Sequence, residues 1–450
     1  TETYSRKLLS RCAERRLETR SGEITEALRV GATVSRAVDL SANARISSRG
    51  MQLIGKGFIV TRDRAAELGL GRLNESQKHI REYRNGRDLN ATPRGVLVID
   101  VFGLSEEEIR ERFPEIYQHL LENMRPERRQ NRRQSYRDNW LYFGEPRSDL
   151  RLALRSLPRF LATVETSKHR MFVFLNAEIL PDNKLVSFAL SDAFSLGVLS
   201  SRVHTTWASA AGSRLGIGND LVYVKSKCFE TFPFPDPDDS TKARIRELGE
   251  QLDSHRKRQQ ELHPDLTMTG MYNVLEKLRT DDPLTAKEKT IHEQGLVSVL
   301  KQIHDELDAA VFEAYGWPIT LTDEEILERL VALNKHRAAE EERGLIRWLR
   351  PEFQNPGGVT EVQTKLIADP ETPSPAKKAK VKKQPWPKTL PERITAVRKL
   401  LVEQQAALTP TDVAVRFSRA KKDNIEELLD TLVTVGQARQ TETGLYVAAN

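Results

Sequence analysis

Hydrophobic and polar positions divide the chain into a strand-rich first half and a helical second half. In the first half, short apolar or β-branched segments bounded by turn-forming residues predict strands. These segments are Val96–Val101, Phe160–Val164, Arg170–Leu175 and Lys184–Leu190. From Ser240 onward, apolar residues recur at helical spacing between charged residues. The long helices predicted in this way are Thr241–His263, Thr285–Glu313 and Thr322–Glu342. The pattern indicates an α+β fold.

Shorter elements are marked by capping and turn-forming residues. Ser105 followed by Glu108 predicts a capped helix start, and Pro114 predicts a kink or a split in that helix. A further helix is expected over Asp192–Ala211, entered through Ser191 or Asp192. The remaining expectations are a strand pair or glycine-bent strand in Gly50–Val60, a short helix in Thr61–Leu70, and extended segments in Val222–Lys225 and Phe229–Phe232.

Changes of composition divide the chain into five parts. Residues 1–50 predict a mostly helical, then extended connector, 51–237 a strand-rich domain closed by three prolines, and 238–355 a helical domain. Residues 356–391 predict a flexible linker, because 369–391 is rich in proline and lysine with few apolar residues. Residues 392–450 predict short helices followed by a hairpin, with a turn at 442–444. That order is typical of a small winged-helix-like module.

Composition and charge exclude some classes of protein and favour others. No apolar run approaches the roughly 20 residues that span a bilayer, and the polar, basic first residues do not form a signal peptide. No membrane partner is therefore expected, and two cysteines fit a reducing cytoplasm. Because the first residue is Thr1 and not methionine, the sequence is expected to be a piece of a longer polypeptide. The net charge of +6 favours a polyanionic partner, most clearly at 125–137, where six arginines stand against one acid.

Motifs for catalysis are absent from the sequence. There is no Asn/Asp-Pro-Pro-aromatic tetrad, the motif that holds a flipped base in amino-methyltransferases, and no P-loop, HExxH or cysteine–histidine metal spacing. The glycine clusters Gly69–Gly71 and Gly216–Gly218 do not stand between a buried strand and a helix, as a nucleotide-binding loop requires. We therefore expect no catalytic residue, no metal and no cofactor in this chain.

Eight strings of residues, in this order, resemble the MmeI-like (type IIL) DNA adenine methyltransferases and related phage-defence methylases of the BREX and DISARM kind. They are LIGKGFIVT (53–61), YRNGRDL (83–89), RGVLVIDVFGLSE (94–106), YRDNWLYFGEPR (136–147), LPRFLATVETSKHRMFVFL (157–175), LGVLSSRVHTTWA (196–208), CFETFPFP (228–235) and ALNKHRAAEEERGLIRWLRPEF (332–353). In that family, these strings form the target recognition domain and the helical tail behind the catalytic domain. The resemblance implies that 51–237 is a DNA target recognition domain. It also implies that S-adenosylmethionine is bound by a catalytic domain that this chain lacks.

A domain that reads bases needs polar, forked side chains on strands or loops, and the segment Glu165–Arg170 offers such groups. Arg170 can form two hydrogen bonds to a guanine, and Glu165 can accept one from a cytosine. Ser167, Lys168 and His169 are further candidates for base or phosphate contacts. The alternative is an ordinary polar hairpin edge.

Three other groups of residues are candidates for DNA contact. His204–Asp220 contains His204, Trp207, Arg214 and Asn219 beside glycines that would let backbone approach a groove, or it is only a glycine-rich loop. A further polar cluster is formed by Arg81, Arg84, Asn85, Arg87 and Asp88, and pairing of Asp88 with a nearby arginine is the alternative. Phosphate contacts, which position a protein without reading sequence, are assigned to Lys56, Arg128, Arg129, Arg132 and Arg133. Trp140, Tyr142 and Phe143 are expected in the core, with stacking on an extruded base as the alternative.

Two functions remain open from the sequence. The first is sequence-specific recognition of duplex DNA for an S-adenosylmethionine-dependent adenine-N6 methyltransferase of a restriction–modification or phage-defence system, with the catalytic subunit or domain as partner. The second is a protein-interaction subunit of a phage-defence complex that binds other defence proteins and attracts DNA only through its charge.

Overall fold

The computed structural model describes residues 6–11, 17–22, 33–215, 220–357, 384–387, 390–404, 408–418, 422–434, 438–440 and 446–448. The chain divides into two units, Thr1–Asp369 and Pro370–Asn450, and each is described by itself. Asn219 and the predicted turn at 442–444 lie outside the described residues.

The centre of the first unit is an antiparallel sheet whose strands are almost entirely buried. Its order is β3 (Ser47–Arg49), β11 (Leu185–Phe188), β7 (Arg159–Val164) and β9 (Val173–Asn176). Every residue of β11 is buried, as are all of β7 except Arg159. Continuous apolar runs of this kind are typical of strands that are covered on both faces. The predicted strands in 160–164, 170–175 and 184–190 are confirmed.

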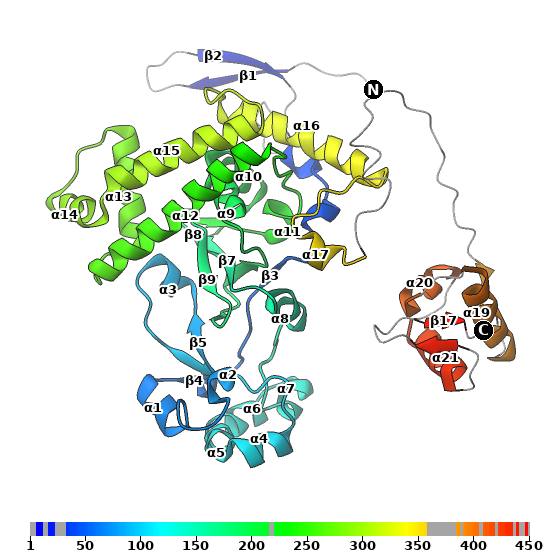
Figure 1. The fold of residues 1–450 in the computed structure, drawn as a ribbon. Coiled ribbons are helices and arrows are strands. Elements are labelled where there is room, and N and C mark those ends of the chain that lie inside the picture. Colours follow the sequence, from blue (N-terminus) through cyan, green and yellow to red (C-terminus); the bar gives the residue numbers. More distant parts are fainter. Residues whose placement is uncertain are drawn as a thin grey trace. The chain divides into compact units, whose positions relative to one another are not determined.

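Long helices pack around this sheet and form the larger lobe of the first unit (Figure 1). They are α9 (Ala193–Ser200), α10 (Arg202–Ala211), α12 (Asp239–Leu262), α13 (Met268–Thr280), α14 (Ala286–Gly295), α15 (Val297–Ala314) and α16 (Asp323–Glu342). Two helices predicted as continuous are broken. Ser201 is extended between α9 and α10, and Leu296 adopts a left-handed conformation with φ 42° between α14 and α15.

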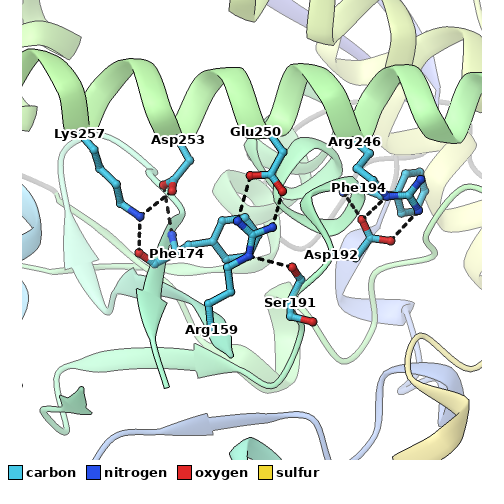
Figure 2. Close-up of polar contacts among 9 residues, drawn as sticks. All are labelled: Arg159, Phe174, Ser191, Asp192, Phe194, Arg246, Glu250, Asp253 and Lys257. Carbon is cyan, nitrogen blue, oxygen red and sulfur yellow. Dashed lines mark hydrogen bonds and ion pairs between the residues drawn. The ribbon is translucent and has the colours of Figure 1, made fainter. Parts of the chain in front are cut away.

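Polar contacts fix α12 along the edge of the central sheet (Figure 2). The Glu250 carboxylate accepts two hydrogen bonds from the Arg159 guanidinium, one of 2.9 Å. One turn on, Asp253 accepts from the backbone N–H of Phe174 at 3.2 Å, and Lys257 donates to the carbonyl of Phe174 at 2.8 Å. Together these contacts fix the position of α12 along β7 and β9.

A smaller lobe contains a second sheet in the order β10 (Leu180–Pro181), β5 (Ile80–Arg84), β6 (Leu97–Ile99) and β4 (Ile59–Val60). Short helices surround it (Figure 1): α1 (Arg62–Glu67), α2 (Ser76–His79), α3 (Gly86–Asn90), α4 (Glu106–Arg112), α5 (Pro114–Asn123), α6 (Arg125–Arg129), α7 (Gln134–Asp138) and α8 (Ser148–Leu154). The capping box of Ser105 and Glu108 is confirmed, as is the split at Pro114, which is the first residue of α5.

One hydrophobic core extends through both lobes, from Ile46 to Leu330. The boundary predicted at residue 237 therefore falls inside a continuous core. Side-chain amides add hydrogen bonds between segments that are distant in the sequence. Asn43 donates to the carbonyls of residues 229 and 232 at 2.8 and 2.7 Å, and Asn334 of α16 donates to those of residues 38 and 231 at 2.9 and 2.7 Å. Gln354 of α17 (Pro351–Gln354) donates to those of residues 42 and 44 at 2.9 and 2.8 Å. Residues 38–44 are thus bound to residues 229–232, α16 and α17.

Three local predictions are wrong. The described residues before 33 form an antiparallel hairpin of β1 (Arg6–Arg11) and β2 (Leu17–Gly22), where helix was expected. Lys225, the last residue of the expected extended segment Val222–Lys225, instead begins α11 (Lys225–Cys228). In 50–60, a 3₁₀ turn at Lys56–Phe58 precedes the short β4, so most of this segment is not strand.

The second unit has three helices followed by an antiparallel hairpin, in the order expected. These elements are α19 (Leu390–Gln404), α20 (Pro410–Val415), α21 (Lys422–Thr434), β16 (Ala438–Gln440) and β17 (Tyr446–Ala448), with β14 (Gln384–Pro385) parallel to β15 (Phe417–Ser418). Its own core includes Val397, Phe417 and Leu429. Winged-helix identity stays a prediction.

Candidate nucleic-acid interface

A small antiparallel sheet follows the end of β7 and contains two of the residues predicted to contact DNA, Ser167 and Arg214. Its order is β12 (Ser213–Leu215), β13 (Asp220–Val222) and β8 (Thr166–Ser167). All three residues of β12 are exposed, so Arg214 lies on an exposed edge strand. The structure therefore places Arg214 where a large ligand has access to it.

Glu165 lies where β7 meets this small sheet, and its carboxylate is buried. It pairs with Arg49 of β3 and, at 3.0 Å, with Lys184. The backbone of Glu165 is also engaged, because its carbonyl accepts from Tyr223 at 2.7 Å. The predicted acceptor role towards cytosine is wrong, since two cations of the protein already occupy this carboxylate. Glu165 instead holds Arg49 and Lys184, whose side chains are 54% and 66% exposed.

Arg170 connects the central sheet to the small sheet. Its guanidinium donates to the carbonyl of Val164, to the Thr163 hydroxyl at 3.2 Å and to the carbonyl of Leu221 at 3.0 Å. Its carbon Cζ lies 5.0 Å from the Tyr223 ring centroid, and burial lowers the pKa of the guanidinium. The predicted contact with guanine is contradicted, because the guanidinium already donates its hydrogen bonds to acceptors of the protein itself.

His204 belongs to the aromatic core and does not reach the surface. Its ring is fully buried between the Leu199 carbonyl at 2.8 Å and the Tyr223 hydroxyl at 3.1 Å. Burial lowers the pKa of His204 to about 4, so the ring is neutral at pH 7. Its predicted DNA contact is wrong for this reason, and Trp207 on the same helix is likewise buried.

The other residues of the predicted 165–170 segment face α13 and α3. Ser167 is buried and donates to Asn90 at 3.3 Å, which contradicts its predicted exposure to DNA. Lys168 is exposed and contacts Asn273 at 2.8 Å and Glu276 at 3.1 Å. His169 is half-buried against Asn273, and burial lowers its pKa. Only Lys168 presents a charge at the surface here.

The cluster at α3 is organised by a capping box. The Asn85 side chain accepts from Asp88, and Asp88 accepts from the backbone of Asn85 at 2.9 Å. Asp88 also receives two hydrogen bonds from Arg94, at 2.8 and 2.9 Å, so its pairing with a nearby arginine is confirmed. Arg84 pairs with Glu82, whereas Arg87 is exposed and its guanidinium has no partner among the described residues. Arg87 is the member of this cluster that is available to a ligand.

The arginine-rich segment 125–137 contains one buried arginine and several exposed ones. Arg128 is 1% exposed and donates to the carbonyls of Leu53 at 2.9 Å and Tyr142 at 2.7 Å. Its predicted phosphate contact is wrong, because its guanidinium holds the loop before β4 against α6. Arg129, Arg132 and Arg133 are exposed, as predicted phosphate contacts must be.

Lys56 lies beside these arginines. Its backbone N–H donates to the Glu127 carboxylate of α6 at 3.2 Å, and its side chain is exposed. The flanking glycines allow this close approach, since a Cβ on Gly55 would lie 2.2 Å from Met124. The core positions expected for Trp140 and Phe143 are confirmed. Lys56, Arg129, Arg132 and Arg133 are thus exposed in, beside or just after α6, and we name this group of four residues the basic surface.

Two further features were missed in the sequence. No local sequence pattern marks Arg49 and Lys184 as site residues, because their common partner Glu165 is 116 residues from Arg49 and 19 residues from Lys184. Phe102 is a large apolar side chain exposed at the end of β6. Its only sequence signal is its place after a buried strand and before Gly103.

No group of three or more potential metal ligands occurs in the described ranges, and no helix there is long and apolar enough to cross a membrane.

Comparisons with known proteins agree with this architecture. Residues 33–236 match the family model "MmeI, target recognition domain". DNA methyltransferase A of Bacillus subtilis (strain 168) is 28% identical over 171 residues, which are 37% of this chain and 16% of that protein. A structure of the type IIL restriction–modification enzyme MmeI in complex with DNA superposes with a TM-score of 0.55 at 16% identity, covering 75% of this chain and 42% of that one. The chain thus spans less than half of either relative. Residues 33–236 are therefore similar to the target recognition domain of the MmeI family.

Proposed function

We propose that this chain recognises a short duplex DNA sequence on behalf of an S-adenosylmethionine-dependent DNA adenine-N6 methyltransferase. The observation that carries the proposal is the match of 33–236 to the target recognition domain family, supported by a fold similar to that of an enzyme bound to DNA. Adenine inside a duplex must be flipped out before it is methylated, so a separate surface has to grip the duplex and read neighbouring bases. The catalytic domain, with its cofactor, is not within these 450 residues.

The basic surface supplies the phosphate contacts in this proposal. Exposed arginines form bidentate hydrogen bonds with phosphate oxygens, and each neutralised phosphate releases a counterion. Lys56, Arg129, Arg132 and Arg133 are exposed on short helices and turns of one lobe. They position the duplex without reading its sequence.

Base reading is assigned to exposed guanidinium groups that folded elements hold in place. Arg49 is the strongest, because β3 fixes its backbone and Glu165 fixes its side chain while 54% of that side chain stays exposed. Arg87 and Arg214 are the other two. A forked guanidinium of this kind suits the two acceptors of guanine in the major groove.

Binding to a randomised duplex library at two salt concentrations tests the proposal. A motif of several base pairs that survives the higher salt is expected, and Arg49→Ala should relax one position of it. Binding without a motif that disappears with salt would favour the interaction-protein alternative.

A matched pair of triple variants separates the basic surface from net charge. Arg129→Ala/Arg132→Ala/Arg133→Ala should lower the slope of log K against log salt by up to about 0.9 for each lost phosphate contact. The control is Arg258→Ala/Lys287→Ala/Lys289→Ala, which removes three exposed charges from α12 and α14. Equal effects of the two variants would show that net charge alone attracts the DNA.

We also propose the kind of system to which this chain belongs. We place it in a restriction–modification or phage-defence system of the bacterial cytoplasm, where the DNA of the bacterium is the substrate of methylation. The second unit, as a winged-helix-like module, would contact DNA or another defence protein. Methyl transfer from labelled S-adenosylmethionine after mixing with the partner methyltransferase tests the catalytic assignment, and no transfer to the selected motif would refute it.

A further inference from the structure

Phe102 is an exposed aromatic side chain on a rigid turn. It follows β6, whose neighbours Asp100 and Val101 are buried, and 41% of the residue is exposed. Gly103, with φ 90°, completes the turn, and Leu104 donates to the carbonyl of Val101 at 3.2 Å. The ring is thus held at the surface by the backbone before any ligand arrives.

Arg151 of α8 covers part of this ring and is itself fixed. Its carbon Cζ lies 4.4 Å from the Phe102 ring centroid. The guanidinium forms two hydrogen bonds with Asp100, at 2.6 and 3.0 Å, and a third with the carbonyl of Pro146 at 2.7 Å. Phe102 and Arg151 therefore form a pre-ordered stack, so little conformational entropy is lost when a flat group joins it.

The surroundings of the stack suit a nucleotide. Phe102 borders two hollows of 430 and 530 Å³. The larger has an apolar lining that includes Met51, Leu154 and Leu180. Its charged lining residues are four cations, Lys78, Arg81, Arg151 and Arg155, against one acid, Glu178. Arg155 is exposed, and its guanidinium has no partner in the part of the chain that the structure describes.

We propose that Phe102 stacks on the face of a nucleobase of the bound DNA, with Arg155 beside the adjoining phosphate. The proposal rests on the proposed function and names a contact within it. Apolar surface and positive charge side by side match a base and its phosphodiester better than an apolar protein surface, which would leave Arg155 desolvated. Because every base has an aromatic face, this contact adds affinity and register but reads no sequence.

The test uses duplexes enriched from the randomised library, with 2-aminopurine placed in turn at each position. The wild-type chain should change the fluorescence at one position, because stacking on Phe102 alters the stacking of that base. Phe102→Ala should abolish this change and weaken binding roughly 5- to 150-fold, the range for loss of one base–aromatic stack. Phe102→Leu keeps the apolar bulk and should also lose the fluorescence change. Arg155→Ala should lower the salt slope by about 0.9.

Leu152→Ala is the matched control, because Leu152 is also exposed and apolar on α8 next to Arg151, and borders neither of the two hollows beside Phe102. It should bind as the wild type does. If the wild type selects a motif but both Phe102 variants bind and fluoresce as it does, the stacking proposal is overturned and the proposed function stands. If the wild type binds no duplex, the proposed function fails first. Loss of methyltransferase partner binding with DNA affinity unchanged would assign Phe102 to a protein contact and overturn the proposal.

Discussion

Arg128 and Arg129 are adjacent in α6, yet the structure predicts opposite consequences for their removal. Arg128 is buried, with Cζ 5.7 Å from the Phe58 ring centroid and 5.4 Å from that of Tyr136. Arg129 is exposed. We predict that Arg128→Ala lowers the free energy of unfolding strongly, and that Arg129→Ala leaves it unchanged within about 0.5 kcal/mol.

The magnitude for Arg128 follows from its hydrogen bonds. Two short bonds to carbonyl oxygens, each worth about 1.5–3 kcal/mol for a charged donor, would be lost. Two effects reduce the sum. The Leu53 carbonyl keeps a bond from Gly144 at 3.3 Å, and the Arg128 Nε atom is already buried without a partner. A loss of about 3 to 4 kcal/mol is expected, a large part of the 5–15 kcal/mol that is typical of a folded domain.

Urea denaturation followed by tryptophan fluorescence measures the loss, because Trp140 lies in the core of the same lobe. DNA binding is then compared where both variants are folded. Arg129→Ala should lower the salt slope by about 0.9, whereas folded Arg128→Ala should keep the wild-type slope. The reasoning would be refuted if Arg128→Ala unfolded at the wild-type urea concentration and lost one unit of salt slope.

Two further predictions concern stability. His204 and His304 have pKa values lowered by burial to about 4 and about 3, so the folded state releases protons that the unfolded state binds. The free energy of unfolding should therefore be highest above pH 6.5 and fall at lower pH. At 1.36 kcal/mol per pKa unit, the loss is on the order of 3 kcal/mol for His204 as the pH drops towards 4, and on the order of 5 kcal/mol for His304 as it drops towards 3. Thermal unfolding between pH 7 and 4 measures this, and a midpoint that does not move would contradict it. Gly249→Ala should destabilise by about 1–3 kcal/mol, although alanine favours helices, because its Cβ would lie 2.3 Å from the carbonyl oxygen of Ala193. Ser254→Ala, at an exposed position of α12, is its control, and stabilisation by Gly249→Ala would show that α9 and α12 can separate at no cost.

The elements that the sequence predicted correctly depend on residues close together in the chain. A capping box needs only Ser105 and Glu108, and a helix stop needs only Pro114. The breaks at Ser201 and Leu296 left no such signal. Ser201 is extended where Asp308 of α15, more than a hundred residues away, accepts from the backbone N–H of Arg202 at 2.6 Å. Tertiary contacts of this kind override local helical spacing.

The candidate site was predicted only in part, for the same reason. Glu165 and Arg170 have the side chains that base reading requires, but partners distant in sequence engage both of them. Arg128 could have been recognised as buried. It continues the stripe of Ile116, Leu120 and Met124 at intervals of four residues, and every side chain in that stripe is buried. Arg129, Arg132 and Arg133 lie outside that stripe and are exposed, and their contacts with DNA stay predictions.

The amide contacts of Asn43, Asn334 and Gln354 bear on how specificity can be transferred between such proteins. They connect residues 38–44 to residues 229–232, α16 and α17, beside a core that both lobes share. A chimera joined at residue 237 would take the core residues before this position from one parent and those after it from another. Exchange of 33–357 as a block keeps these contacts within one parent. If the proposed function holds, the unit to exchange for a new DNA specificity is therefore the smaller lobe together with the larger lobe and its helices.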